Sequence, residues 1–361
     1  MSDYQETLTR LGEYLLVPGE PNARLNPRWL ARRFGVPERE LLTALAYAVR
    51  DGLVELRWEV YCPVCGRSPG EFGSLKEAHS QIECAACESC FDLHLDRDVR
   101  VTFSATESIR RMRGRGGAPL LPEDDTEPAT RGLDLLLIPS FWELFSGEAP
   151  ADDESLRVGR VAILFTDLRG STAMYQERGD PRAYHLVRDH FAILGECIDR
   201  NRGSLVKTIG DAVMASFASG ADAVSAALEA QAELRAQSQL MGAELVLKAG
   251  VHAGACLAVK LNNRLDLFGG AVNLAARVQG LSRGNDVVVT DAVVADIEAE
   301  AVTSATESHI AESFDAELRG IPTPVRVHRL IALEVNRSWR TGQAPIMMIP
   351  SSSDRFALIE G

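Results

Sequence analysis

The sequence predicts an α+β protein built from a small helical module, a cysteine-rich segment and a larger α+β domain. Three observations support this. The chain has 361 residues, enough for two or three domains. Five of its seven cysteines lie between Cys62 and Cys90. From Arg160 onward, apolar strands alternate with segments of helical periodicity. We expect five parts, namely 1–60, 61–102, 103–157, 158–332 and 333–361.

Composition excludes several classes of protein. Hydrophobic residues make up 46% and charged residues 25%, which is ordinary for a globular chain and excludes a wholly disordered one. The net charge is −13, from 38 basic and 51 acidic residues, which argues against binding nucleic acid or anionic membrane through bulk charge. No apolar run approaches the ~20 residues of a membrane span, and the N-terminus has no secretory pattern. We therefore expect a cytoplasmic protein without membrane contact.

Residues 1–60 resemble a winged helix-turn-helix. Asn26-Pro27 is typical of a helix start, and a second helix follows Pro37 with apolar residues on one face. A strand is expected over residues 53–58. The second helix opens with Glu38-Arg39-Glu40. Reading a DNA groove usually takes Arg, Lys, Asn or Gln at that end, so the sequence favours a protein contact over DNA binding.

Residues 61–102 contain two C-x-x-C pairs with 18 intervening residues. Each pair forms a turn that aims two thiolates at one point, and two such turns complete a closed tetrahedral zinc site. The expected ligands of one structural Zn²⁺ per chain are Cys62, Cys65, Cys84 and Cys87. Cys90 and His79 are further candidate ligands, and a set of reduced, buried thiols without metal is the alternative. Residues 103–157 are expected to be a linker with a short helix near Phe141.

The last large domain begins with an apolar strand that ends at Asp167. Its other expected elements are a helix from Asp180 to Gly203, a hairpin of 204–209 and 212–217, a helix over 221–237, a strand over 245–252, a helix after Gly270 and a strand over 287–289. The final thirty residues carry few core signals and are expected to be a tail.

Asp167 and Asp211 are the candidate chemical groups. One ends a buried strand and the other lies in the hairpin turn, so the two carboxylates can clamp divalent cations. Asp167 is followed by a glycine-containing turn into a helix, whose backbone N–H groups can cradle phosphates. That turn comprises Leu168, Arg169, Gly170, Ser171 and Thr172. From spacing alone, a helix-capping role for Asp167 fits equally well.

Three motifs carry a resemblance to a known family. They read F-T-D-L-R-G-S-T from Phe165, K-T-I-G-D-A-V-M-A-S-F from Lys207 and D-L-F-G-G-A-V-N-L-A-A-R from Asp266. In order and spacing they resemble the class III nucleotidyl cyclase catalytic domain, over about residues 158–330. The resemblance implies a ferredoxin-like fold, in which helices cover an antiparallel sheet.

The resemblance also implies roles for single residues. Asp167 and Asp211 match the ligands of two Mg²⁺ or Mn²⁺ ions. Lys207 and Asp266 match the adenine-selecting pair: Lys207 can donate to adenine N1, and Asp266 can accept from the exocyclic amine. Guanine inverts this pattern and would leave both groups unpaired. The remaining assignments are Asn273 for the ribose, Arg277 for the transition state and Arg319 for the terminal phosphates.

The implied activity is conversion of ATP to 3′,5′-cyclic AMP and pyrophosphate. In this family the two metal-binding aspartates come from one subunit and the remaining groups from the other, so the resemblance implies a homodimer. The N-terminal region would be regulatory, with a ligand or protein as its partner. Two alternatives stay open: a transcription regulator with a nucleotide-sensing cyclase-like domain, and a cyclase that makes another cyclic nucleotide.

Overall fold

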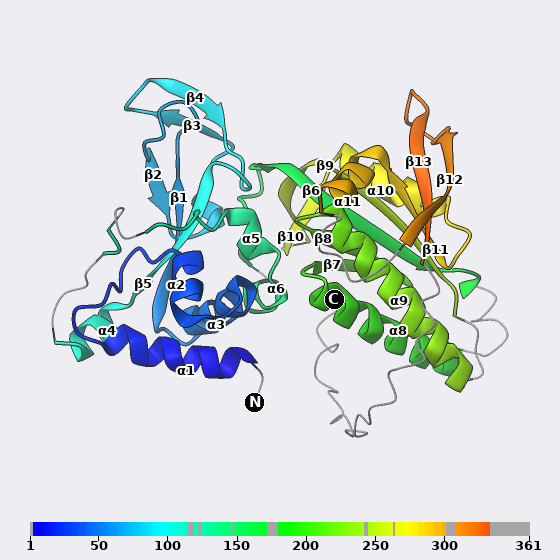
Figure 1. The fold of residues 1–361 in the computed structure, drawn as a ribbon. Coiled ribbons are helices and arrows are strands. Elements are labelled where there is room, and N and C mark those ends of the chain that lie inside the picture. The colour runs from blue at the N-terminus through cyan, green and yellow to red at the C-terminus, as the bar shows by residue number, and fades with distance from the viewer. Residues whose placement is uncertain are drawn as a thin grey trace.

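The computed structural model describes residues 3–114, 119–121, 125–145, 147–171, 180–241, 245–262, 264–300 and 308–332. The chain forms an N-terminal half and a larger C-terminal half that lie side by side, with short helices between them (Figure 1). Within the described residues, no helix is both long enough and apolar enough to cross a membrane.

The N-terminal module is a helix-turn-helix followed by paired strands, as the sequence predicts. Its helices are α1 (Asp3–Leu16), α2 (Pro27–Phe34) and α3 (Glu38–Arg50). Asn26 caps α2 by accepting the N–H of Arg28, and Gly35 ends it with a φ of 65°. Strand β1 (Val54–Val60) pairs with β5 (Val99–Ala105) on one side and with β2 (Gly70–Phe72) on the other.

The cysteine-rich segment is an insertion between two paired strands. β1 and β5 are antiparallel partners from Val54↔Ala105 to Val60↔Val99, so residues 61–98 leave and re-enter the same sheet. The insertion contains β3 (Gln81–Cys84) and β4 (Ser89–Asp92), which form a hairpin, and a 3₁₀ turn, η1 (Leu75–Glu77). One sheet thus crosses both boundaries expected at residues 60 and 102.

The described residues of the region expected to be a linker contain three helices, α4 (Glu107–Met112), α5 (Gly132–Leu136) and α6 (Pro139–Leu144). Of these, α6 was expected from the sequence. It begins at Pro139, whose fixed φ and missing N–H suit a first helical turn. Figure 1 shows α5 and α6 between the N-terminal module and the sheet of the larger half.

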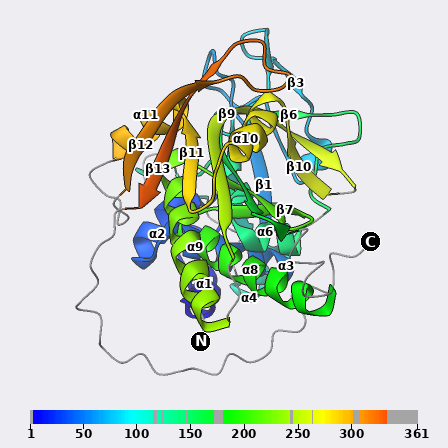
Figure 2. The same ribbon diagram turned by 90° about the vertical axis from the view of Figure 1, so that its right-hand side faces the viewer.

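The C-terminal half is an eight-stranded sheet with helices on both faces (Figure 2). The strand order is β12-β13-β11-β9-β6-β8-β7, with β10 paired to β9. β9 and β11 run parallel, so the sheet is mixed where an antiparallel one was expected. The strands are β6 (Leu156–Leu168), β7 (Ser204–Ile209), β8 (Ala212–Phe217), β9 (Leu247–Leu261), β10 (Arg264–Phe268), β11 (Asp286–Thr290), β12 (Ser308–Ala316) and β13 (Val325–Ala332).

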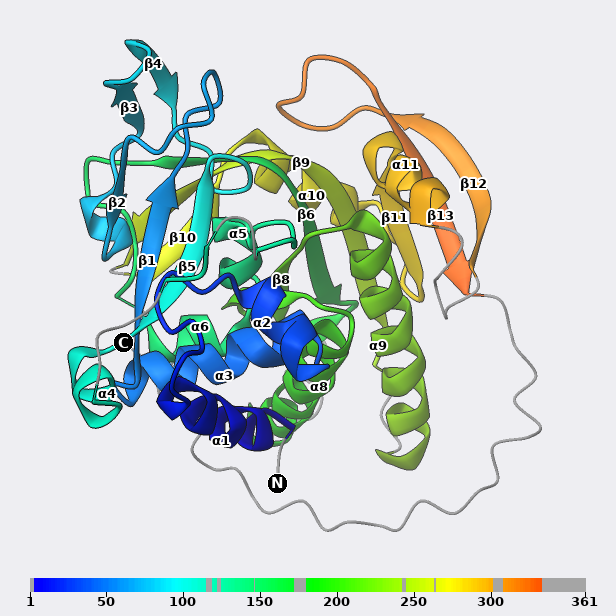
Figure 3. The ribbon, with the colours of Figure 1, turned by 60° about the vertical axis from the view of Figure 1, so that its left-hand side comes forward.

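Alternate residues of β6 enter two different cores. Ala162 and Leu164 pack with α8 (Asp180–Arg200), α9 (Gly220–Met241) and α11 (Asp291–Glu300). Ile163 and Phe165 face the opposite side, where α10 (Gly270–Gly280) lies. This second core continues into the N-terminal module (Figure 3). The two halves therefore share one apolar core. The expected tail, 333–361, lies outside the described residues.

Candidate active site and cysteine cluster

Asp167 and Asp211 lie next to each other. Asp167 is the penultimate residue of β6, and Asp211 sits in the turn between β7 and β8, where Gly210 takes a φ of 64°. The Asp211 carboxylate accepts the N–H of Leu168 at 3.3 Å. Burial, and then the charge of Asp211, raise the pKa of Asp167. Two half-buried carboxylates that repel each other and offer only oxygen atoms form a donor set that suits Mg²⁺ or Mn²⁺.

The turn after Asp167 offers a smaller phosphate cradle than the sequence predicts. The N–H of Leu168 already binds Asp211, and the N–H of Arg169 donates to the carbonyl of Val246 at 2.9 Å. A cradle is therefore restricted to Gly170, which has a φ of 75°, and to residues after it. Ser171 is the last described residue there, and Thr172 lies outside the described residues.

Lys207 and Asp266 meet although 58 residues separate them in the chain. Lys207 Nζ donates to Asp266 Oδ2 at 2.5 Å, while Oδ1 accepts the N–H of Leu267 at 2.7 Å. The Asp266 side chain is 9% exposed and that of Lys207 is 34% exposed. One donor and one acceptor thus stand together at an edge of the sheet, which is the arrangement needed to read the edge of an adenine ring.

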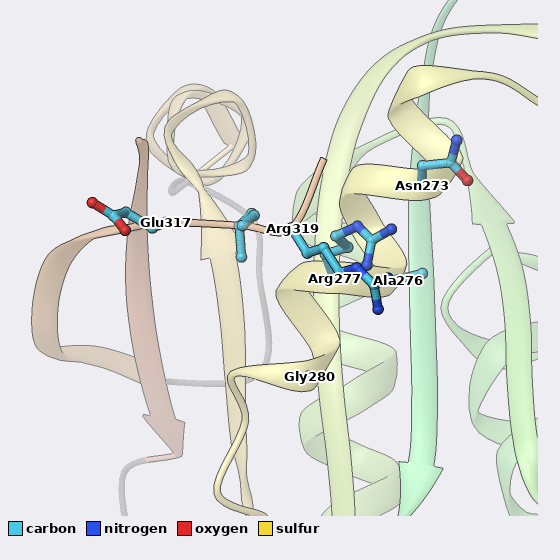
Figure 4. Close-up of a pocket in the computed structure, with 7 residues that line it drawn as sticks. Asn273, Ala276, Arg277, Gly280, Glu317 and Arg319 are labelled. Atoms are coloured by element: carbon cyan, nitrogen blue, oxygen red, sulfur yellow. The ribbon is translucent and has the colours of Figure 1, made fainter. Parts of the chain in front are cut away.

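Asn273 and Arg277 lie on α10 beside a cavity of about 400 Å³ (Figure 4). Arg319 enters it from the turn after β12, and its side chain extends toward Arg277. Within the part of the chain that the structure describes, neither arginine makes an ion pair or hydrogen bond, so two guanidinium groups are available to an anion. Glu317 also lines the cavity, and no sequence pattern marks it beyond its closeness to Arg319.

Gly250 sets how closely α10 approaches the sheet. Gly250 lies in β9, between Phe165 of β6 and Val288 of β11. A Cβ atom there would stand 2.2 Å from the backbone nitrogen of Gln279 on α10. Only glycine allows this close approach. Gly250 therefore sets the distance between the sheet and α10, the helix that carries Arg277.

Four cysteines form a cluster in the N-terminal half. The sulfurs of Cys62, Cys65, Cys84 and Cys87 all lie within 4.8 Å of one another. Two of the sulfur pairs are 3.7 Å apart. A tetrahedral Zn²⁺ with bonds of about 2.3 Å needs edges of about 3.8 Å, so the spacing suits zinc. Ser89 Oγ lies 3.4 Å from Cys62 Sγ, and its hydrogen bond lowers the pKa of Cys62 to about 6, which favours the thiolate that metal binding requires. The pKa of Cys65 moves the other way, to about 11: a backbone hydrogen bond at Arg67 lowers it, but burial and the hydrogen bonds with the neighbouring sulfurs raise it more.

The two further candidate ligands lie outside this cluster. Cys90 is exposed and is not among the four clustered cysteines. His79 Nδ1 instead contacts the carboxylate of Glu154 at 3.0 Å. Ser89 is a contributor that sequence reasoning missed, because its contact with two of the sulfurs depends on the β3–β4 turn.

Two family models match different parts of this chain. Residues 154–329 match the family described as "Adenylate and Guanylate cyclase catalytic domain". Residues 16–124 match a family of unknown function, DUF5939. An adenylate cyclase of Anabaena cylindrica is 32% identical over 170 residues, 41% of this chain and 34% of the relative. A putative adenylate cyclase 3 of Rhizobium meliloti is 28% identical over 177 residues, 48% of this chain and 28% of the relative. The chain thus spans about a third or less of these relatives.

Solved structures of an adenylyl cyclase and of a guanylyl cyclase each align with about half of this chain. The adenylyl cyclase CyaB from P. aeruginosa has 19% identity and a TM-score of 0.42, over 51% of this chain and 98% of that one. The guanylyl cyclase Cya2 has 20% identity and a TM-score of 0.43, over 50% and 96%. The three sequence motifs all lie within residues 154–329, the part of this chain that matches the adenylate and guanylate cyclase catalytic domain family.

Proposed function

We propose that this protein is an adenylate cyclase that converts ATP to 3′,5′-cyclic AMP and pyrophosphate. One observation carries the proposal: the carboxylates of Asp167, at the end of β6, and Asp211, in the turn between β7 and β8, are neighbours. A pair of acidic groups held this way fits a cation site for phosphoryl chemistry. The adenylate cyclases among the relatives support the reaction class.

Each polar group has a role in this mechanism. Asp167 and Asp211 would hold two Mg²⁺ or Mn²⁺ ions, which supply Lewis-acid activation of the ribose 3′-hydroxyl and neutralise the triphosphate. Lys207 and Asp266 bind the adenine edge, and Asn273 orients the ribose. The 3′-oxygen attacks the α-phosphorus, and pyrophosphate leaves. Arg277 stabilises the charge that grows on the α-phosphoryl group. The free guanidinium of Arg319 suits the terminal phosphates.

A product assay tests the activity. Purified protein with Mn²⁺ is incubated separately with ATP, GTP, CTP and UTP, and cyclic nucleotides are separated by chromatography. We expect cyclic AMP with ATP and little product with the other three. Asp211→Asn keeps the side-chain shape but removes the charge, so it should abolish product. Full activity of Asp211→Asn, or preference for another nucleotide, would contradict the proposal.

We also propose that the active form is a homodimer with two shared sites. Asp167→Ala and Arg277→Ala are each expected to be inactive, and a mixture should regain activity because one of its sites contains no substitution. Asp167→Ala mixed with Asp211→Ala is the matched control. Both substitutions lie in the same half-site, so no intact site can form. Equal recovery in both mixtures, or in neither, would refute a shared site.

The cysteine cluster is proposed to bind one structural Zn²⁺. A closed set of four sulfur ligands keeps no open position, so the metal would stabilise the insertion between β1 and β5. Such thiolates persist in a reducing compartment such as the cytoplasm. Elemental analysis should give one zinc per chain for the protein and for Cys90→Ser, and a large loss for Cys87→Ser. Equal zinc content in the two variants would refute the assignment.

A further inference from the structure

The first turn of α3 makes contacts within the chain. The Glu38 carboxylate accepts from Arg28 Nε at 2.7 Å, and that of Glu40 accepts from the Thr7 hydroxyl. Arg39, between them, reaches out of the module to the cyclase domain. The helix that would enter a DNA groove thus has its polar groups engaged elsewhere, which leaves Arg39 as a link between the two halves.

Arg39 donates to three acceptors at once. One guanidinium nitrogen donates to the carbonyl of Leu137 at the end of α5, at 2.8 Å. Another donates to the carbonyl of Gly203 at 2.7 Å and to the carboxylate of Asp199 at 2.8 Å. The Arg39 side chain is only 23% exposed. Hydrogen bonds from a charged, partly buried donor are stronger than those between neutral groups, so Arg39 attaches the module firmly at this point.

The attachment point lies just before the strand that carries Lys207. Gly203 precedes β7, which is the last strand of its sheet and, among the residues that the structure describes, pairs with β8 alone. The pairing is interrupted by a bulge between Leu205 and Lys207. An edge strand with a bulge is held on one side only, so its position depends on contacts beyond the sheet. Arg39 supplies such a contact four residues before Lys207.

Apolar contacts also join the N-terminal half to the strands that carry Lys207 and Asp266. Val206 beside Lys207 and Leu265 beside Asp266 pack into the core that also contains Trp58 and Phe141 of the N-terminal half. Trp58 and Phe141 are in edge-to-face contact, with ring centroids 6.1 Å apart. The strands of the proposed base-reading pair are therefore supported from the N-terminal side by both polar and apolar contacts.

We infer that Arg39 is a positioning residue through which the N-terminal module holds β7, and with it Lys207, in the place needed to recognise adenine. The inference rests on the proposed function. It assigns the N-terminal module a direct part in nucleotide selection. Arg39 acts through the backbone of Gly203, not by touching the nucleotide.

Steady-state kinetics of Arg39→Ala tests the inference. Base recognition contributes to substrate binding, so the KM for ATP should rise about tenfold while kcat changes less than about twofold. The preference for ATP over GTP should fall. Arg39→Lys retains one charged donor group, so its KM for ATP and its preference for ATP over GTP should lie between those of the wild type and of Arg39→Ala. Arg50→Ala is the control: Arg50 is on the same helix but contacts Asp51 and Tyr47 within its own module, so its kinetics should match the wild type. A merely structural role would lower the active fraction, and thus kcat, at unchanged KM.

Hydrogen exchange gives a readout that does not need catalysis. The amides of residues 204–209 should exchange faster in full-length Arg39→Ala than in Arg50→Ala, without nucleotide. Equal exchange would overturn the inference whether or not the protein makes product. An unchanged KM and base preference, or a gain of activity, would overturn it as well. If the wild type makes no cyclic nucleotide, the proposed function fails, and exchange alone decides whether Arg39 positions β7.

Discussion

Replacing Gly250 by alanine tests how the sheet sets the position of Arg277. The added Cβ would lie 2.2 Å from the backbone nitrogen and 2.3 Å from the Cα of Gln279, whereas real Cβ contacts essentially never fall below 3.0 Å. The first of these contacts must therefore lengthen by about 0.8 Å (3.0 − 2.2). Both clashing atoms belong to the α10 backbone, so no side-chain rotation can relieve them and the helix must move.

The expected cost has two parts. Overpacking of this kind destabilises a fold by about 1–3 kcal/mol, which urea unfolding would measure. A displacement near 1 Å at a reacting group can cost ~100-fold in rate. Arg277 is two residues from Gln279 on the same helix, so kcat for cyclic AMP formation should fall by about that factor. Residual activity should persist because no polar group is lost.

Gly195→Ala is the matched control. Gly195 lies within α8, and a Cβ there would meet nothing within 4 Å. Alanine is the better helix former, so this variant should gain roughly 0.5–1 kcal/mol and keep full activity. If Gly250→Ala matched Gly195→Ala in both stability and kcat, the close approach of α10 to β9 would not control the site, and the reasoning would be refuted.

Three further predictions concern a buried ion pair, a buried histidine and a carboxylate that accepts two backbone N–H groups. Arg329→Met should cost ~3–5 kcal/mol in chemical denaturation because it leaves the buried carboxylate of Asp286 without its ion-pair partner; a loss below ~1 kcal/mol would contradict this. Burial lowers the pKa of His252 to about 4 from 6.5, so unfolding binds a proton between these values and stability falls as the pH drops through that window. His252→Gln should remove up to roughly 3 kcal/mol of that fall, and identical pH profiles would exclude the assignment. Asp96→Ala removes the acceptor for the N–H groups of Gly159 and Arg160, so amide exchange at both should accelerate.

Elements defined by local signals could be predicted from the sequence. The hairpin of β7 and β8 has the predicted bounds, because a Gly-Asp turn separates two runs of strand-forming residues. The Asn26-Pro27 start of α2 is also as predicted, since cap and proline act within one turn. The closeness of Asp167 and Asp211 followed from placing one at a strand end and the other in this turn.

Features that depend on distant partners could not be predicted. The parallel pairing of β9 with β11 joins segments about forty residues apart, and nothing local marks its direction. The loss of two N–H groups from the expected phosphate cradle follows from Val246 and Asp211, which lie far along the chain. The contact of Arg39 with Gly203 likewise joins residues 164 positions apart. Each is a tertiary contact that overrides or supplements a local pattern.

The apolar core common to the two halves bears on how this chain can be divided. Leu156, Leu265 and Leu267 are nearly inaccessible to water in the whole protein and belong to the same cluster as Trp58 and Phe141. A fragment cut at the start of the cyclase match would uncover these leucines and favour self-association. The residue at which the family match begins is therefore not the residue at which a separately stable part of the chain begins. Exchanging the N-terminal half for that of another protein would require the residues of this shared core to be redesigned as well.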